Sequence, residues 1–170
     1  MHNKIYNCIW YDFGEALPAA EFYMSLGIPS SHIRRVVTTP ADNPSTQEGD
    51  DLLVEFELGG QIFIGLNGGP RFPQTEAVSF MIVTQDQEET DFLWRAIVSN
   101  GGEESACGWC KDRWGVNWQI TPRKLLDLLA DPNIERSRAA FFAMEGMTRI
   151  EIASLEDAVA RLELEQNGLV

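Results

Sequence analysis

The chain contains three cysteines, two of which form the motif Cys107-Gly-Trp-Cys110. Thiols at this spacing do redox chemistry when a helix N-terminus lowers their pKa, and they bind zinc when a second pair completes four ligands. The residues that follow, KDRWG, are typical of a turn, and only Cys8 is left as a third thiol. The sequence therefore favours a structural role at the end of a strand over a redox or zinc role.

Three glutamates are the weak candidates for a catalytic base. Glu55 and Glu57 alternate with apolar residues along a predicted strand, and Glu76 opens the second half of the chain. Each could accept a proton from a substrate if its carboxylate points into a binding site. A solvated strand face is the commoner explanation, because carboxylates are mostly exposed. The catalytic residues are therefore left unassigned.

Neutral polar side chains alternate with apolar ones along several predicted strands, whose side chains point to opposite faces in turn. In the segment 61–67 the apolar row is Ile62, Ile64 and Leu66, and the mixed row is Gln61, Phe63, Gly65 and Asn67. We expect helices to pack on wholly apolar rows, and mixed rows to line a cleft that is partly apolar and partly hydrogen-bonding. The alternative is that mixed rows face solvent or a partner subunit.

The residues predicted to bind a ligand come from these mixed rows and from the tryptophans near them. Trp118 is expected in the core, whereas two other tryptophans could flank a ligand or a dimer contact. The predicted ligand-binding residues are Asn7, Asn67, Ser79, Asn117, Gln119, Trp109 and Trp114.

The first half of the chain predicts a strand, a helix and three further strands. The first strand, Ile5–Phe13, is rich in β-branched and aromatic residues, and the helix after it ends at Gly27, where a left-handed backbone is needed. The further strands are Ile33–Thr38, Leu52–Leu58 and Gln61–Asn67, with an exposed loop at Pro40–Asp51 and a tight turn at Gly59-Gly60.

The second half repeats this order. Glu76–Val83 predicts a strand, and Asp86 with Glu89 forms a capping box at the start of a helix that ends at Asn100-Gly101-Gly102. The strands that follow are Glu103–Trp109 and Val116–Thr121, separated by the turn 111–115. Asp12 and Asp86 occupy matching points, so we predict two similar β-α-β-β-β modules, about 4–70 and 75–122, within a single domain over 1–170.

A helical extension is predicted over 122–166. Thr121-Pro122 is expected to open its first helix as an N-cap and N1 pair, and Asp131-Pro132 to separate it from a second helix that Gly146 closes. Ser154 with Asp157 is expected to cap the last helix. These helices could cover an exposed sheet edge or a dimer partner.

The composition is that of a globular chain with an acidic surface. Hydrophobic residues make up 44% of the chain, and the formal net charge is −13 at pH 7. Such a surface repels phosphate backbones and anionic lipid, which argues against nucleic acid and membranes as partners. The N-terminal residues MHNKIYNCIWYDF do not resemble a signal peptide, and three cysteines are a poor disulfide framework. We therefore expect a soluble cytoplasmic protein.

Four stretches of sequence are recognisable together. They are WYDFGEALPAAEFYMSLG, GGQIFIGLNGGPRFPQTEAVSF, DQEETDFLW and CGWCKDRWGVNWQITPRKLLDLLADP. With them the chain resembles the PhnB-like family, often labelled as a 3-demethylubiquinone-9 3-methyltransferase domain, over roughly residues 5–158. That family is similar to the vicinal-oxygen-chelate superfamily of glyoxalase I, bleomycin-resistance proteins and extradiol dioxygenases. The resemblance implies an α+β fold of paired β-α-β-β-β modules around a U-shaped cleft (glyoxalase/bleomycin resistance/dihydroxybiphenyl dioxygenase-like), with C-terminal helices, and a homodimer.

Enzymes of that superfamily hold a divalent metal with inward-facing His or Glu side chains, so that the metal polarises two oxygens of the substrate. The resemblance places the matching positions at about Ile5, Gly65 or Asn67, Ala77 and Gln119. None of these is a histidine or a carboxylate, and a neutral glutamine would not anchor a metal alone. The resemblance therefore implies a protein without a metal, and we expect no other cofactor.

Three hypotheses about function stay open. The first is a metal-free protein that binds a small molecule in a cleft between the modules. The second is an enzyme, either a methyltransferase, as the family label suggests, or a lyase or isomerase with a base such as Glu55. The turn Gly68-Gly69-Pro70 links two strands and does not form the glycine-rich strand-to-helix turn of the common methyltransferase fold. The third is a dimeric scaffold with a vestigial cleft.

Overall fold

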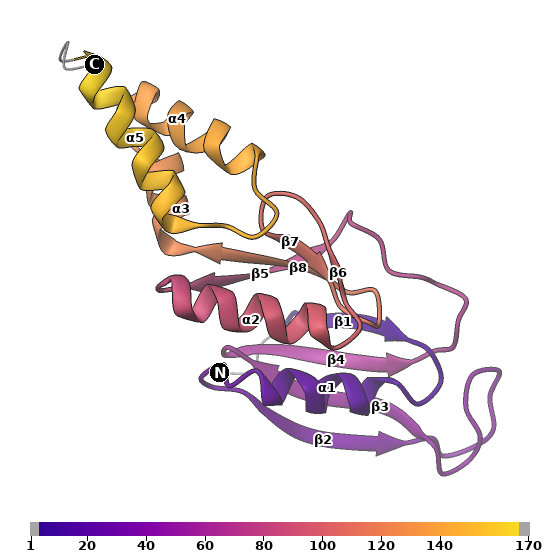
Figure 1. Cartoon of the computed structure of the whole chain (residues 1–170). Coiled ribbons are helices and arrows are strands. Elements are labelled where there is room, and N and C mark those ends of the chain that lie inside the picture. The colour runs from indigo at the N-terminus through magenta and orange to yellow at the C-terminus, as the bar shows by residue number, and fades with distance from the viewer. Residues whose placement is uncertain (1–3, 167–170) are drawn as a thin grey trace. The chain divides into compact units, whose positions relative to one another are not determined.

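The computed structural model describes residues 4–166 of the chain. The chain divides into two compact units, Met1–Gln74 and Thr75–Val170, and each is described by itself below (Figure 1). Within the described residues, none of the helices combines the length and the apolar character that crossing a membrane requires.

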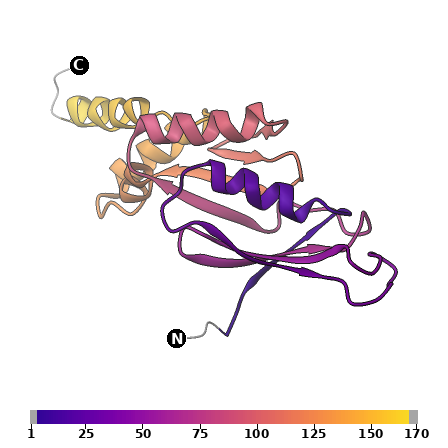
Figure 2. The ribbon, with the colours of Figure 1, turned by 90° about the horizontal axis from the view of Figure 1, so that it is seen from below.

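The first unit is a four-stranded sheet with one helix. Its strands are hydrogen-bonded in the order β1-β4-β3-β2, with β1 parallel to β4 and the other pairs antiparallel. Helix α1 runs along this sheet (Figure 2). The elements are β1 (Asn7–Tyr11), α1 (Ala16–Ser25), β2 (His32–Thr38), β3 (Asp51–Leu58) and β4 (Gln61–Asn67).

The core of the first unit lies between α1 and the mixed row of β4. Phe63 stacks on Phe56 of β3 at 5.3 Å between ring centroids, and Phe56 in turn contacts Tyr23 of α1. A Cβ on Gly65 would lie 2.9 Å from the Cβ of Ala16, so the helix approaches the strand as closely as these small residues permit. The expectation that a helix covers the apolar row of β4 is therefore wrong, because close helix packing needs Gly65 and the aromatic ring of Phe63 on this face.

The second unit repeats the topology of the first. Its strands are hydrogen-bonded in the order β5-β8-β7-β6, with β5 parallel to β8, so the predicted β-α-β-β-β repeat is confirmed at the level of strand order. The elements are β5 (Ser79–Thr84), α2 (Gln87–Ser99), β6 (Glu103–Glu104), β7 (Trp109–Lys111), β8 (Asn117–Pro122), α3 (Arg123–Leu129), α4 (Ile134–Glu145) and α5 (Ile152–Gln166).

Several predicted element ends are confirmed. The side chain of Asp86 accepts a hydrogen bond from the N–H of Glu89 at 2.9 Å, as the capping box requires. Gly27 has a φ of 68° after α1, and Gly59-Gly60 forms the turn between β3 and β4 with positive φ angles. The loop 40–50 separates β2 from β3, and Gly146 caps the end of α4.

The predicted strand over 103–109 is wrong. The structure breaks it into β6 and β7, because Cys107 (φ 59°) and Gly108 (φ 80°) both adopt the left-handed conformation between them. Their N–H groups donate to the carbonyls of Met147 and Thr148 at 2.8 and 2.7 Å. The turn therefore anchors the segment between α4 and α5 to the sheet.

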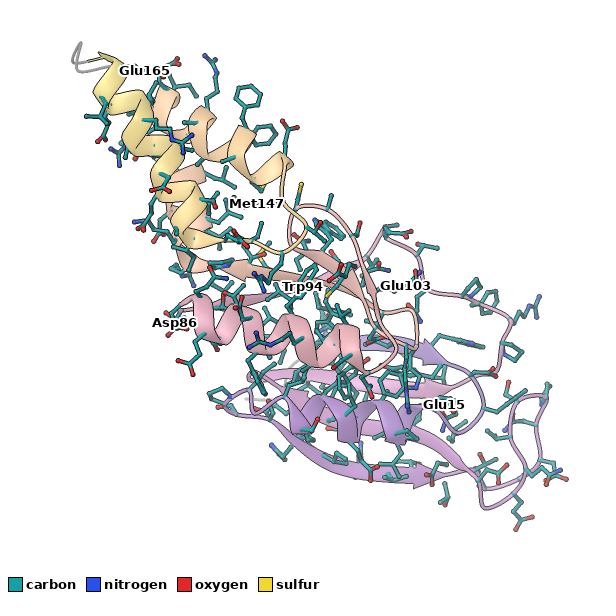
Figure 3. All side chains as sticks on the ribbon, viewed as in Figure 1. Glu15, Asp86, Trp94, Glu103, Met147 and Glu165 are labelled. Atoms are coloured by element: carbon teal, nitrogen blue, oxygen red, sulfur yellow. The ribbon has the colours of Figure 1, made fainter. Side chains whose placement is uncertain are left out.

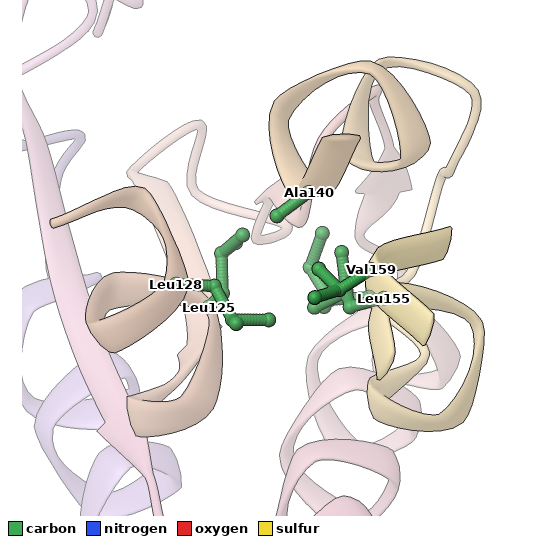
Figure 4. Packing of buried hydrophobic residues seen from close by; sticks show 6 residues of the cluster. Leu125, Leu128, Ala140, Leu155 and Val159 are labelled. Atoms are coloured by element: carbon green, nitrogen blue, oxygen red, sulfur yellow. The ribbon is translucent and has the colours of Figure 1, made fainter. Parts of the chain in front are cut away.

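The C-terminal helices form a small core of their own. Leu125 and Leu128 of α3, Ala140 of α4, and Leu155 and Val159 of α5 point toward one another, and each is at most 6% exposed (Figure 4). The helical extension is thus confirmed, and its break at Asp131-Pro132 falls between α3 and α4.

Two predicted helix starts in this extension are wrong. Thr121 and Pro122 belong to the end of β8, and α3 begins at Arg123 without a side-chain cap. Helix α5 begins at Ile152 rather than after Ser154, because the side-chain oxygen of Gln87 accepts the N–H of Ile152 at 2.8 Å. A residue of α2, far away in sequence, therefore sets the start of α5.

Replacing Gly102 by alanine is expected to lower the free energy of unfolding by about 3 kcal/mol. A Cβ at this position, between α2 and β6, would lie 2.5 Å from the carbonyl oxygen of Ile97 and 2.6 Å from that of Lys111. Both are backbone atoms that cannot rotate away. Gly146→Ala is the matched control, because its Cβ would meet nothing nearer than 3.7 Å. Urea unfolding of the full chain measures both, and equal midpoints for the two variants would contradict the prediction.

Candidate functional site

The candidate site is one face of the sheet in the second unit. Ser79 of β5 lies opposite Asn117 of β8, and Met81 lies opposite Gln119. On the other side of β8, Gln119 lies opposite Trp109 and Asn117 opposite Lys111. Residues directly opposite each other in a sheet share a face, so these side chains form two short rows across three strands. We call this surface the polar face; it comprises Ser79, Met81, Trp109, Lys111, Asn117 and Gln119.

The other face of the same sheet packs on α2. Trp118 and Ile120 of β8 are at most 1% exposed, and Leu93 and Ile97 of α2 are equally buried. Trp94 lies on α2 (Figure 3). Its Nε1–H donates to the carboxylate of Glu104 at 3.1 Å and so fixes β6 to the helix. In this sheet α2 packs on the apolar row of β8. The expectation that helices pack on wholly apolar rows is therefore confirmed here.

A hydrogen bond links the two polar side chains at the centre of this face. The side-chain N–H of Gln119 donates to the Ser79 hydroxyl oxygen at 2.9 Å. This orients the amide oxygen of Gln119 as an acceptor and keeps the hydroxyl hydrogen of Ser79 available as a donor. Trp109 is half-buried beside Gln119, and Met81 is 45% exposed on its other side. A donor and an acceptor are thus flanked by two apolar surfaces.

A cavity of about 140 Å³ adjoins the polar face. Its walls carry three carboxylates and one ammonium group, and Lys111 pairs with Glu103 at 2.8 Å. The hydrogen bond to Glu103 raises the pKa of Lys111, so the ammonium stays charged. The excess of carboxylates favours a cationic group or a hydrogen-bond donor in the cavity. The lining residues are Glu76, Glu103, Glu104, Ser105, Trp109, Cys110, Lys111 and Asn117.

Two further predicted site residues of this unit have side chains that contact the turn before β8: Asn117, at the edge of the polar face, and Trp114, outside it. Asn117 is only 5% exposed, and its side-chain N–H donates to the carbonyl of Gly115 at 3.2 Å. Trp114 is half-buried in the turn before β8, with the Arg113 guanidinium 4.2 Å above its ring. Both side chains therefore shape the turn that precedes the candidate site.

Asn67 of the first unit has a structural role in this fold. It is fully buried, its side-chain oxygen accepts the N–H of Ala16 at 2.9 Å, and its side-chain N–H donates to the carbonyl of Asp51 at 2.8 Å. We correct the expectation for this residue, because both ends of its amide are occupied by backbone groups. Asn7, at the start of β1, is half-buried with one long contact of 3.5 Å to the Ile62 carbonyl.

The predicted bases have different surroundings. Glu55 is buried, and its two carboxylate oxygens pair with Arg34 at 3.0 Å and Arg35 at 2.7 Å. Both oxygens of this carboxylate are thus occupied by guanidinium groups, which argues against Glu55 as a base. Glu57 is half-buried two residues on, whereas the exposed Glu76 lines the cavity beside the polar face.

The positions that would hold a superfamily-type metal do not fit one. Gly65 and Ala77 have no side-chain donor atom, and the side-chain nitrogen of Gln119 donates to Ser79. Over residues 4–166, no three His, Cys, Asp or Glu side chains come together in a group that could hold an ion. Glutamine oxygen alone is too weak a ligand for a divalent metal, so we derive no step through such a metal.

The Cys-x-x-Cys motif supports the fold rather than redox chemistry. Cys107 lies in the anchoring turn, and Cys110 is 2% exposed in β7. Burial raises the pKa of the Cys110 thiol to about 12, and the charges of Asp112 and Glu104 add to this shift. At neutral pH such a thiol stays protonated and is a poor nucleophile.

The raised pKa of Cys110 predicts a loss of stability at alkaline pH. Above the ordinary thiol value of 9.0 the unfolded chain loses this proton while the native chain keeps it. Deprotonation therefore favours unfolding, and this group lowers the unfolding free energy by up to about 1.4 kcal/mol per pH unit. Urea unfolding between about pH 8 and pH 10.5 should show a shallower decline for Cys110→Ala than for the unsubstituted chain. Identical slopes would contradict the prediction.

Sequence reasoning missed the carboxylate that holds the turn before β8. Asp112 is 2% exposed, and its side chain accepts the N–H groups of Trp114 at 2.9 Å and Val116 at 3.0 Å. Its second oxygen accepts the indole N–H of Trp118 at 2.9 Å. The signal was an Asp at the start of a five-residue turn, a position that aspartate favours for this reason. Lys111 and Glu103 were also missed, because only the strand register places them beside the predicted residues.

The comparisons with known proteins agree on one family. The sequence model of the 3-demethylubiquinone-9 3-methyltransferase family matches residues 3–121, which end just before α3. No curated protein sequence matches the chain.

Solved structures match the same part of the chain. A PhnB protein from Bacillus cereus is 26% identical with a TM-score of 0.62, and the match covers 71% of this chain and 99% of that one. A protein from Pseudomonas aeruginosa shares the fold at 16% identity with a TM-score of 0.56, covering 71% and 98% of the two chains. A glyoxalase/bleomycin resistance protein from Albidiferax ferrireducens matches at 18% identity and a TM-score of 0.41, covering 66% and 94%. The chain therefore belongs to the 3-demethylubiquinone-9 3-methyltransferase family and is similar to the PhnB protein of that description.

Proposed function

We propose that this protein binds a small molecule on the polar face of its second unit without the help of a metal ion. The observation that carries the proposal is the hydrogen bond between Gln119 and Ser79, which presents one acceptor and one donor between Trp109 and Met81. Small-ligand sites combine apolar walls with a few oriented polar groups in this way.

The chemistry of the face defines the class of ligand. The donor and the acceptor, side by side, complement an amide or another group that both donates and accepts. Trp109 offers an aromatic surface on which a flat ligand can stack. The carboxylates of Glu76, Glu103 and Glu104 in the adjoining cavity favour an amine or another donor at one end of the ligand. We therefore propose a flat, uncharged or cationic ligand with an amide-like edge.

Methyl transfer is the second candidate, favoured by the description of the matching family. The cavity of about 140 Å³ is smaller than the roughly 300 Å³ or more of pockets that enclose drug-sized ligands such as S-adenosylmethionine. Within the second unit, the cavity would thus hold only part of that cofactor. At the polar face this favours a smaller ligand over S-adenosylmethionine.

A thermal-shift screen of the metal-stripped full chain tests the proposal. Aromatic amides and amines are expected to raise the melting temperature, because a ligand that binds only the native state stabilises it. S-adenosylmethionine and a set of aliphatic carboxylates are tested separately in the same screen. A shift with S-adenosylmethionine alone would favour the methyltransferase, and a shift that needs an added divalent metal would overturn the metal-free site.

A further inference from the structure

The exposed side of α4 carries an apolar surface without a partner in the described part of the chain. Ile134 is 64% exposed, Phe141 43% and Phe142 62%, and the two phenylalanine rings meet edge to face at 5.9 Å. Exposed aromatic residues on one helix face are characteristic of protein interfaces. This helix lies beyond residue 121, where the match to the family's sequence model ends.

These residues belong to one continuous face. At about 100° per residue, five exposed positions fall within an arc of about 100° on the side opposite the buried Ala140. We call this surface the α4 face; its residues are Ile134, Arg138, Phe141, Phe142 and Glu145. It is wide enough for one helix to pack on it.

The arrangement of charges on the α4 face is symmetric about the aromatic pair. Arg138 and Glu145 lie at equal distances, about 5 Å along the helix axis, from the point midway between Phe141 and Phe142. In an antiparallel pair of identical helices related by a two-fold axis at this point, Arg138 of each copy faces Glu145 of the other. Phe141 of each copy then lies beside Phe141 of the other, and Phe142 beside Phe142. Such self-complementarity is what a two-fold interface requires.

We propose that two copies of this chain associate through their α4 faces as an antiparallel helix pair. The four interdigitated phenylalanine rings form the apolar centre, and two ion pairs lie at its ends. On the same helix Arg138 contacts Glu135 at 3.0 Å, so in the dimer its guanidinium lies between two carboxylates. This compensates locally for the net charge of −13 on each copy, which otherwise opposes association.

One helix pair buries less surface than the roughly 1,200 Å² of stable complexes, so the dimer should depend on concentration. Sedimentation velocity of the full chain over a hundredfold concentration range is expected to show a monomer–dimer equilibrium. Phe142→Ser should weaken it at least about tenfold, since truncating a central aromatic residue removes much of the binding energy. Phe92→Ser, at a 49%-exposed phenylalanine of α2, is the control and should leave the equilibrium unchanged.

A charge exchange tests the antiparallel pairing itself. Arg138→Glu and Glu145→Arg should each weaken the dimer, because like charges then face each other, whereas the double variant should restore it to within about threefold. A monomer at every concentration, or a dimer that Phe142→Ser leaves intact, would overturn the proposal. A double variant as weak as the single ones would overturn the antiparallel arrangement. Mixing the chain with its own Phe142→Ser variant distinguishes a second copy from an unrelated partner, because mixed dimers should be weaker than dimers of the unsubstituted chain.

Discussion

Replacing Asp112 by alanine is expected to lower the free energy of unfolding by about 4 kcal/mol. The buried carboxylate accepts N–H groups from Trp114, Val116 and the indole of Trp118. Alanine leaves these donors without an acceptor in an apolar interior, and each such donor costs about 1–3 kcal/mol. The turn before β8 would lose the side chain that holds it together.

Two further variants make this prediction specific. Asp112→Asn keeps one oxygen for the turn but turns a side-chain N–H toward the indole N–H of Trp118, so we expect a loss of about 2 kcal/mol. Asp127→Ala removes an exposed aspartate from α3 and should change the unfolding free energy by less than about 0.5 kcal/mol. Urea unfolding measures all three variants. A loss of under about 1 kcal/mol for Asp112→Ala would show that the carboxylate does not organise the turn.

Replacing Asn67 by alanine is expected to destabilise the first unit by about 3 kcal/mol. Its amide joins the start of α1 to the start of β3 through the N–H of Ala16 and the carbonyl of Asp51. The substitution leaves both backbone groups unpaired, in a position that no water reaches in the folded chain. Hydrogen exchange should show that the Ala16 amide loses its protection before the strands do.

Asn7→Ala is the matched control for this prediction. Asn7 lies on the same face of the same sheet, but it makes only one contact of 3.5 Å and is half-buried. Its replacement should cost less than about 1 kcal/mol. Equal losses for the two asparagines would mean that the amide of Asn67 is not the link between helix and sheet.

The order of elements was predictable because it depends on local signals. Asp86, Gly27 and the Gly59-Gly60 turn act through their own backbone neighbours, and the sequence shows those neighbours directly. The Pro break between α3 and α4 acts in the same way. Local chemistry of this kind yields the repeated topology of the two units.

Side chains that act across long distances in the sequence could not be predicted. Gln87 sets the start of α5 from 65 residues away, and Asn67 binds the start of α1 from 51 residues away. In the sequence both residues fit ordinary polar positions of a helix or strand pattern. The face of β4 was predicted wrongly for the same reason, because Gly65 reveals its role only when Ala16 packs against it.

The motifs that identify the family have structural explanations. In LNGGP, a Cβ on Gly68 would overlap the indole ring of Trp10, and the indole N–H donates to the Gly69 carbonyl at 2.6 Å. In DRWGVNW, Asp112 holds the turn and the Trp118 indole. The glycines and the aspartate of these motifs therefore support the fold, whereas the proposed ligand contacts come from other residues of the same stretches, such as Ser79 and Gln119.

The central claim is that the polar face binds a ligand without a metal, and isothermal titration tests it most directly. The best compound of the thermal-shift screen is titrated into three metal-stripped proteins: the unsubstituted chain, the variant Gln119→Leu and the variant Gln85→Leu. Gln85→Leu is the control, because Gln85 is exposed and lies outside the polar face. We predict saturable binding to the unsubstituted chain and to Gln85→Leu, and at least about tenfold weaker binding to Gln119→Leu, since its leucine leaves ligand groups unpaired. Binding of equal strength to Gln119→Leu, or binding that appears only after a divalent metal is added, would contradict the claim.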